Sequence, residues 1–410
     1  MVSIDAIHRP DNEYRRSRST RPRAACLLLI CTVVPVLSGC WGSPSKEVSS
    51  TFDLKAIAID PVTPTTLYVA TDGGGVFKST DGGSSWAAVN SGLLDLKVTT
   101  LAIDWFTPSR IYAGTENGGI FSSSDYGESW FPPTPISNIR AIVIDRNVCT
   151  STTPSCQWIF VASQESGVWL SQNAGSTYSQ FTENPSNQAV TAMAIYPTTL
   201  PNPAGRLYIG TDGGGIFVRA LHPTVDSKWT EATPGLKVNT QEDVISLAVR
   251  PDVISELYVG TSGGGETSSV GSGIYKSTDA GASFDQVYTP HYPFTIYFVV
   301  PVVGPNATDL TLYAGSDGIV RSTNYGNVKS WCILWDDGSC KNTTPSTILQ
   351  PGLTAFAVAL NKHTDAQGNV SFLIDSTDTP PRPTLYAALF NRQFIKSTDG
   401  GETWTTLSVQ

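Results

Sequence analysis

The stretch LYVATDGGGVFKSTDGGSSW, residues 67–86, decides the fold of this chain. A short apolar segment (67–71) runs into a glycine-rich turn, and a second apolar segment follows over 75–79. A serine–aspartate–glycine turn then leads to Trp86. Short apolar runs separated by Gly and Asp turns predict β-strands joined by tight hairpins.

The first of these segments recurs along the chain. Its seven copies are 44 to 73 residues apart and begin at Leu67, Ile111, Ile159, Leu207, Leu257, Leu312 and Leu385. An apolar strand precedes each copy, and a third and a fourth strand follow it. Four-stranded units at this period are typical of a β-propeller, in which radial packing buries both faces of every sheet. We therefore predict an all-β fold, a single seven-bladed β-propeller of four-stranded blades over residues 54–410.

The tight turn of the repeat carries the motif Ser-x-Asp-x-Gly-x-x-Trp. It is intact over 79–86, 123–130 and 397–404, and it has Phe in place of Trp over 277–284. Repeats three and six have Asn173 and Asn324 in place of the aspartate, and repeat four keeps only Trp229. The motif resembles the Asp-box, or BNR, repeat of sialidases, sortilin-type receptors, xyloglucanase-type glycoside hydrolases and photosystem II assembly factors. The resemblance covers about residues 54–410 and implies a propeller.

Elementary chemistry accounts for the residues of this box. We expect the aspartates to accept hydrogen bonds from amides of their own turn, and the glycine to supply a positive φ. We expect the aromatic residue to pack between neighbouring sheets. The structural box residues are Asp81, Trp86, Asp125, Trp130, Asp279, Phe284, Asp399 and Trp404. A calcium site at the Asp–Gly turns is the functional alternative, although the stacked carboxylates of a calcium loop are absent.

The N-terminus has the pattern of an export signal. Six arginines precede an apolar run over residues 25–37, which is too short to span a bilayer. The run ends in Leu37-Ser38-Gly39-Cys40, which resembles a bacterial lipobox and implies cleavage before a lipidated Cys40. We therefore predict a lipoprotein signal peptide (1–39), then the lipidated cysteine with a flexible tether (40–53). The expected location is the bacterial cell envelope, at the outer membrane in a Gram-negative cell. An ordinary cleaved signal is the alternative.

The net charge and the cysteine spacing bear on nucleic-acid, disulfide and metal chemistry. The net charge of −9 argues against a nucleic-acid partner, and cleavage before Cys40 would leave a net charge of −12. Two close pairs, Cys149/Cys156 and Cys332/Cys340, predict two local disulfides in an exported chain. A metal site is the alternative, but the histidines are scattered, so we expect no metal and no cofactor.

Propeller topology predicts two distinct faces. The turns between the second and third strands share one face with the links between blades, and the box turns lie on the other. Acidic residues in the first set form a candidate binding rim for a cation, a basic protein surface or sugar hydroxyls: Asp72, Glu116, Glu165, Asp212, Glu266 and Asp317. The alternative is that they only solubilise tight glycine turns. Long insertions at 145–158, 197–206, 301–311 and 361–383 are expected on the box face, and 332–352 is expected between blades six and seven.

The residues required for catalysis are not evident. Sialidase-type catalysis needs three arginines, and only Arg140 stands at the start of an innermost strand. Xyloglucanase-type enzymes place aspartates across a cleft between two propellers, and a single propeller has no second wall. We therefore predict a membrane-anchored, non-catalytic scaffold that binds protein partners and whose propeller is monomeric. A surface glycan-binding protein or an Asp-box glycoside hydrolase is the alternative. No strand exchange between the termini is expected, although residues 47–53 are a candidate for an extra strand.

Overall fold

The chain divides into two units, Met1–Lys46 and Glu47–Gln410, and the residues that the structure describes all belong to the second. The structure is a computed structural model. It describes residues 52–105, 107–145, 157–182, 189–196, 205–221, 228–236, 243–250, 253, 255–262, 272–289, 295–303, 310–315, 319–322, 331–334, 340–341, 353–359, 361–364, 370–373, 383–389 and 393–409.

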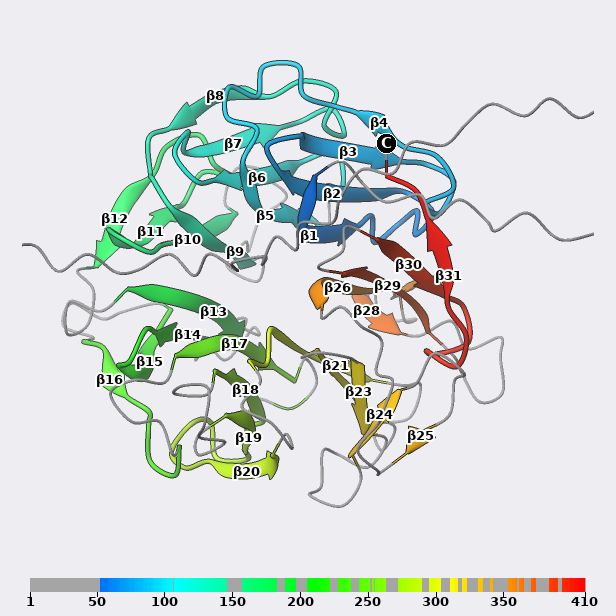
Figure 1. The fold of residues 1–410 in the computed structure, drawn as a ribbon. Helices are drawn as coiled ribbons and strands as arrows, with labels where there is room; N and C mark the ends of the chain where they lie inside the picture. Colours follow the sequence, from blue (N-terminus) through cyan, green and yellow to red (C-terminus); the bar gives the residue numbers. More distant parts are fainter. Residues whose placement is uncertain are drawn as a thin grey trace, which may run out of the picture. The chain divides into compact units, whose positions relative to one another are not determined.

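Seven antiparallel sheets follow one another around a common centre and confirm the predicted seven-bladed β-propeller (Figure 1). Blade one contains β1 (Asp53–Ile59), β2 (Leu67–Asp72), β3 (Gly75–Ser79) and β4 (Ala87–Ala88). Blade two contains β5 (Val98–Ile103), β6 (Ile111–Thr115), β7 (Ile120–Ser123) and β8 (Phe131–Thr134). Blade three contains β9 (Ile139–Asp145), β10 (Trp158–Ser163), β11 (Gly167–Ser171) and β12 (Ser179–Thr182).

The remaining blades repeat this order. Blade four contains β13 (Val190–Tyr196), β14 (Arg206–Thr211), β15 (Gly215–Ala220) and β16 (Thr230–Glu231). Blade five contains β17 (Val244–Val249), β18 (Leu257–Thr261), β19 (Gly273–Ser277) and β20 (Asp285–Tyr288). Blade six contains β21 (Phe298–Val303), β22 (Leu310–Gly315), β23 (Ile319–Ser322), β24 (Trp331–Leu334) and β25 (Cys340–Lys341). Blade seven contains β26 (Leu353–Ala359), β29 (Thr384–Leu389), β30 (Phe394–Ser397) and β31 (Thr405–Leu407).

The second strand of each blade lies in the middle of the core. The residues of β6 and of β18 are all buried, because adjacent blades cover both faces of these strands. Such strands are apolar without alternation, which is the pattern of the repeated segment. Within the described residues there is no helix, and so none that is long and apolar enough to cross a membrane.

Side-chain packing closes the ring. Leu67 and Phe77 of blade one share one buried cluster with Tyr386 and Phe394 of blade seven. Lys396 adds a hydrogen bond from its Nζ to the backbone oxygen of Gly82, at 3.3 Å. Among the described residues, the sheets of blades one and seven contain only their own strands, and no strand is exchanged between them. Asp53 is the first residue of β1, and residues 47–51 lie outside the described part of the chain.

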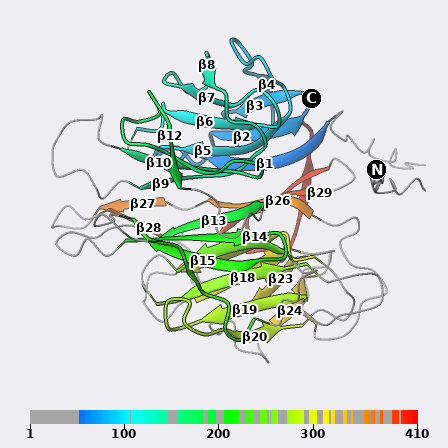
Figure 2. The same cartoon turned by 90° about the vertical axis from the view of Figure 1, so that its left-hand side faces the viewer.

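Two of the expected loops contain strands. The insertion after β24 supplies β25, which pairs with β24 and extends the outer edge of blade six. The insertion after β26 contains the hairpin of β27 (Asn361–Thr364) and β28 (Val370–Leu373). Both strands satisfy backbone groups that a long irregular loop would leave without partners. Figure 2 shows this hairpin on the left-hand side, at the end of blade seven where β26 finishes. Residues 146–156, 197–204 and 304–309 of the other insertions lie outside the described residues.

Candidate functional site

The turns between the second and third strands meet the links between blades at one end of the propeller, which we name the glycine-turn face. The amides of Gly73 and Gly75 both donate to the backbone oxygen of Leu96, at 3.0 and 2.9 Å. The Asp95 carboxylate accepts from the amides of Asn117 and Gly118, at 2.9 and 2.8 Å. The link 89–97 is therefore held to turns of two successive blades.

Three carboxylates of this face have partners. Asp72 lies 3.4 Å from Lys55, and Glu116 lies 2.9 Å from Lys97. Glu165 accepts from the Nδ2 of Asn138, at 2.7 Å, and from the hydroxyl of Ser137. The hydrogen bond to Glu116, together with its charge, raises the pKa of Lys97. The arrangement is a surface of mixed charge in which acidic groups are matched by donors.

Partial burial acts to raise the pKa of Asp95, but the amides of Lys97, Asn117 and Gly118 outweigh it, and the pKa is lowered. A carboxylate that accepts several backbone hydrogen bonds is stabilised in its charged form. Asp95 therefore fixes a turn. It was not singled out from the sequence, where it is the one aspartate among residues 89–97.

The six residues proposed for the rim have different outcomes. Asp72, Glu116 and Glu165 occupy equivalent turns of blades one to three, and Asp212 is exposed at that turn of blade four. Glu266 and Asp317 lie outside the described residues. Within the described part of the chain, no group of three or more His, Cys, Asp or Glu side chains is placed to hold a metal ion. Cation binding by the rim therefore has no geometric support in this part.

Bulges occur near the start of the innermost strands, at the end that leads from the links between blades. The register shifts leave Lys55, Thr99, Arg140, Thr191 and Ile245 between paired residues of their strands. A bulge turns the side chain out of the regular alternation. Lys55 meets Asp72 in this way, and Arg140 donates from its Nε to Gln164, at 2.8 Å. Four of these five residues are polar or basic, but Ile245 is apolar, so residue type alone does not indicate the bulge.

The box turns use their polar groups internally. Asp81 accepts from the Ser79 hydroxyl at 2.8 Å, the Ser85 amide at 2.8 Å and the Ser85 hydroxyl at 2.5 Å. The same set recurs around Asp125, Asp279 and Asp399. The glycines of these turns have positive φ, for example 91° at Gly83. Each aspartate therefore organises its own hairpin turn.

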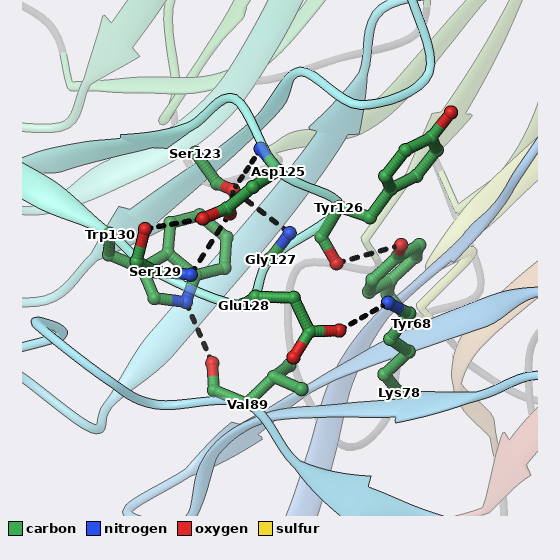
Figure 3. Close-up of polar contacts among 10 residues, drawn as sticks. All are labelled: Tyr68, Lys78, Val89, Ser123, Asp125, Tyr126, Gly127, Glu128, Ser129 and Trp130. Carbon is green, nitrogen blue, oxygen red and sulfur yellow. Dashed lines mark hydrogen bonds and ion pairs between the residues drawn. The ribbon is translucent and has the colours of Figure 1, made fainter.

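The box aromatics reach a neighbouring blade. Trp130 donates from its Nε1 to the Val89 oxygen of blade one, at 2.7 Å (Figure 3). Trp86 meets Phe394 of blade seven edge-on, with 5.3 Å between ring centroids. These contacts account for an aromatic residue at the end of the box.

The box aspartates predict a pH dependence. The hydrogen bonds from Ser283 and Ser277 lower the pKa of Asp279 from 3.8 to about 2. Because the pKa is lower in the folded state, the charged form favours folding above pH 3.8, and this contribution is lost as the pH falls toward 2. Asn173 makes the corresponding hydrogen bonds in blade three, so Asp279→Asn is expected to fold. Denaturant unfolding at neutral and at acid pH should show that this variant loses less stability on acidification than the wild type does. Asp212→Asn removes the same charge from an exposed turn and is the control; equal pH dependence of the two variants would contradict the prediction.

A tyrosine in the second strand connects each of several blades to the next. The Tyr68 hydroxyl donates to the backbone oxygen of Tyr126 at 3.0 Å (Figure 3). The Tyr208 hydroxyl donates to the backbone oxygen of Ala280 at 3.1 Å. Tyr112 and Tyr313 make the same contact with Ala174 and Gly400. We call this contact the interblade latch. Burial raises the pKa of Tyr313 to about 12, so the hydroxyl keeps its proton and donates.

The latch explains an unusual backbone in the box. The accepting residue stands between the Asp and the Gly, and its φ is positive even where it is not glycine, as at Tyr126 (61°) and Ala280 (60°). Repeat four has lost the box. The second strand of the preceding blade, β10 of blade three, has Phe160 in place of the tyrosine. Within blade three Phe160 packs edge-on against Phe181 at 5.3 Å, and the Arg219 guanidinium of blade four lies 4.6 Å from the Phe181 ring. Apolar and cation–π contacts take the place of the latch there.

Removing one latch hydroxyl should have a measurable effect. Tyr68→Phe leaves the Tyr126 oxygen without this donor, and we expect a loss of about 1 kcal/mol in the free energy of unfolding. Phe160→Tyr adds a hydroxyl where repeat four has no box carbonyl, so it should bring no gain. Urea unfolding of the two variants beside the wild type tests this. A gain in Phe160→Tyr, or no loss in Tyr68→Phe, would be the contrary result.

Blade five contains a buried charge cluster that the sequence did not indicate. Glu256 accepts from the Tyr258 hydroxyl at 3.0 Å and lies 3.3 Å from Arg250 and 3.4 Å from Lys276. The Arg250 side chain is only 5% exposed, and those of Glu256 and Lys276 are 13% exposed. The cluster joins the end of one strand to the next two strands of the same sheet, so its role is structural.

The structure does not test the predicted lipid anchor and disulfides. Cys40, Cys149 and Cys156 lie outside the described residues. Cys332 is in β24 and Cys340 is in the adjacent β25, where Leu334 pairs with Cys340. Their side chains are outside the described part. The disulfides and the lipidation therefore stay predictions.

Comparison with known proteins gives the class of fold. No family model and no curated protein matches the chain. The RRP9 WD40 repeats align with a TM-score of 0.51 at 10% identity, over 83% of this chain and 88% of theirs. YCF48 from Cyanidioschyzon merolae aligns at 0.49 and 10% identity, over 89% and 97%. The GH74 enzyme of Niastella koreensis aligns at 0.41 and 15% identity, over 87% of this chain but only 66% of that enzyme. At such identities the likeness concerns the β-propeller fold alone.

Proposed function

We propose that this protein is an exported, lipid-anchored propeller that acts as a non-catalytic scaffold for protein partners. The observation that supports a binding role is the pairing of several described carboxylates. Asp72, Glu116 and Glu165 of the glycine-turn face meet lysines or amide and hydroxyl donors, and the aspartates of the box turns meet groups of their own turn. A glycoside hydrolase needs two carboxylates that flank a bond and are free to protonate and attack. The paired groups described above serve the fold instead.

The box itself supports an Asp-box assignment as part of this proposal. Its serine, aspartate and glycine make one hydrogen-bond set in several blades, and its aromatic residue packs on an adjacent blade. A motif used in this way provides a rigid disc and leaves specificity to the loops and insertions. The β27–β28 hairpin of blade seven is the described insertion on which a partner is expected to dock.

Affinity capture tests the scaffold. Tagged full-length protein is solubilised from its own membranes, and a stoichiometric protein partner is expected to co-purify. Deletion of 361–373, closed by a short glycine linker, should remove that partner. Asp212→Asn, on the opposite face, should retain it and is the matched control. If no partner co-purifies while polysaccharide binds or is hydrolysed, the glycan alternative replaces the scaffold.

The anchor is tested separately. Cys40→Ala removes the residue that would carry the acyl chains, and we expect the protein to move from the membrane fraction to the soluble fraction. Fractionation followed by immunoblotting measures this, with the wild type and Cys149→Ala as controls. Retention of Cys40→Ala in the membrane would show that the lipid is not what holds the protein there.

A further inference from the structure

Two leucines are exposed on the link between blades one and two. Leu94 is 81% exposed and Leu96 is 38% exposed. The Leu96 carbonyl accepts both amides of the Gly73–Gly75 turn, so the link that carries these side chains is tied to the glycine-turn face. The leucines are thus presented from a defined position. An exposed apolar pair on such a scaffold indicates a contact surface.

Phe52, the first described residue, also lies on the glycine-turn face. The Phe52 ring covers Gly74, where an added Cβ would come within 2.5 Å of the ring, and its centroid is 6.3 Å from that of Phe77. Asp53 then pairs with Asp72 as the first pair of β1. The tether, residues 41–51, therefore joins the propeller on the glycine-turn face, beside the turn that binds Leu96. The proposed lipidation site, Cys40, precedes Phe52 by only twelve residues along the chain.

The charges of two ion pairs beside the leucines cancel, and Asp95, between the leucines, adds one carboxylate that accepts hydrogen bonds from backbone amides. Lys55 pairs with Asp72 and Lys97 pairs with Glu116, and these four side chains are roughly half exposed. Lysine side chains of this kind place their apolar stems against hydrocarbon while the ammonium group stays in the polar layer. A surface with two leucines, two paired lysines and one further carboxylate, Asp95, is compatible with the headgroup region of a bilayer.

We propose that the glycine-turn face of blades one and two lies against the lipid bilayer, with Leu94 and Leu96 at the headgroup–acyl boundary. This inference rests on the proposed anchor at Cys40. A short tether holds the bilayer at a high effective concentration beside this face, so a small contact suffices. A stable protein interface needs about 800 Å² from each partner, far more than two leucines supply. The box face, with the β27–β28 hairpin, then points away from the membrane toward a partner.

Depth-dependent fluorescence quenching tests the orientation. Full-length Leu94→Cys protein is reconstituted into vesicles of phosphatidylethanolamine and phosphatidylglycerol and labelled with a thiol-reactive bimane. Val62→Cys, 55% exposed in the β1–β2 loop of the opposite face, is the matched control. Wild-type protein labelled in the same way gives the background of the native cysteines. Acyl-brominated lipids should quench the label at residue 94 about threefold more strongly than at residue 62.

A second arrangement separates this inference from the anchor. Residues 41–410 with an N-terminal hexahistidine tag are held on vesicles that contain a nickel-chelating lipid, which preserves the tether without acylation. If full-length protein fails to float with vesicles, the anchor proposal fails, and this arrangement still decides the orientation. Stronger quenching at residue 94 in it supports the inference. Equal quenching at both positions, or none at residue 94, overturns it.

Discussion

Trp130→Ala is expected to lower the free energy of unfolding by about 3–5 kcal/mol, the range for truncating a large buried aromatic residue. Trp130 is 5% exposed and packs with Tyr68, Val89 and Phe121 in the cluster that joins blades one and two. The substitution opens a cavity between two sheets and removes the 2.7 Å hydrogen bond to the Val89 oxygen. Both losses fall on one interblade contact, which is why the expected effect is large.

Thermal and urea unfolding of the purified protein measure this effect. Trp105→Ala is the matched control, because Trp105 is 46% exposed on a loop of the same blade. The control should change the free energy of unfolding by no more than about 0.5 kcal/mol, as for an ordinary surface substitution. Similar losses in the two variants would contradict the interblade role assigned to Trp130.

Glu256→Ala is expected to cost about 3–5 kcal/mol, because it removes the anion of a buried charge cluster. Arg250 and Lys276 lose this partner in surroundings where water reaches them poorly, and Tyr258 loses its 3.0 Å acceptor. The desolvation of the two cations is then less well compensated. Urea unfolding should show a lower midpoint at unchanged slope.

The control for Glu256→Ala is Glu128→Ala, which removes the glutamate of a more exposed glutamate–lysine pair. Glu128 pairs with Lys78 at 2.7 Å, but the Glu128 side chain is 64% exposed (Figure 3). Glu128→Ala should cost no more than about 1 kcal/mol, since exposed ion pairs contribute little. If Glu128→Ala proved as costly as Glu256→Ala, burial would not be the cause of the difference.

The strands and turns of this protein could be predicted from local patterns. The 67–71 segment and its copies became second strands, and the box glycines took positive φ as expected. The first strand of blade six, β21, extends over Phe298–Val303. Its pairing with β22 has no bulge, unlike the start of β1, and the sequence pattern did not indicate this difference.

The candidate site was predictable only in part. Asp72, Glu116 and Glu165 were identified from their glycine turns, but their pairing with donors was not. Lys55 reaches Asp72 only because a bulge turns it out of its strand, and no residue type by itself indicates that bulge. The acidic composition therefore overstated the free negative charge of this face.

By itself, the sequence determined what depends on neighbours along the chain. The period of the repeat, the four strands of each unit and the hairpin turns follow from apolar runs, Gly and Asp within a few residues of one another. The tertiary structure alone decided the contacts between blades. The bond from Tyr68 to residue 126, the closure through Lys396 and Gly82, and the seat of Phe52 on Gly74 join residues that are distant in sequence. Such contacts depend on how the sheets pack around the axis, and local residue preferences do not determine that packing.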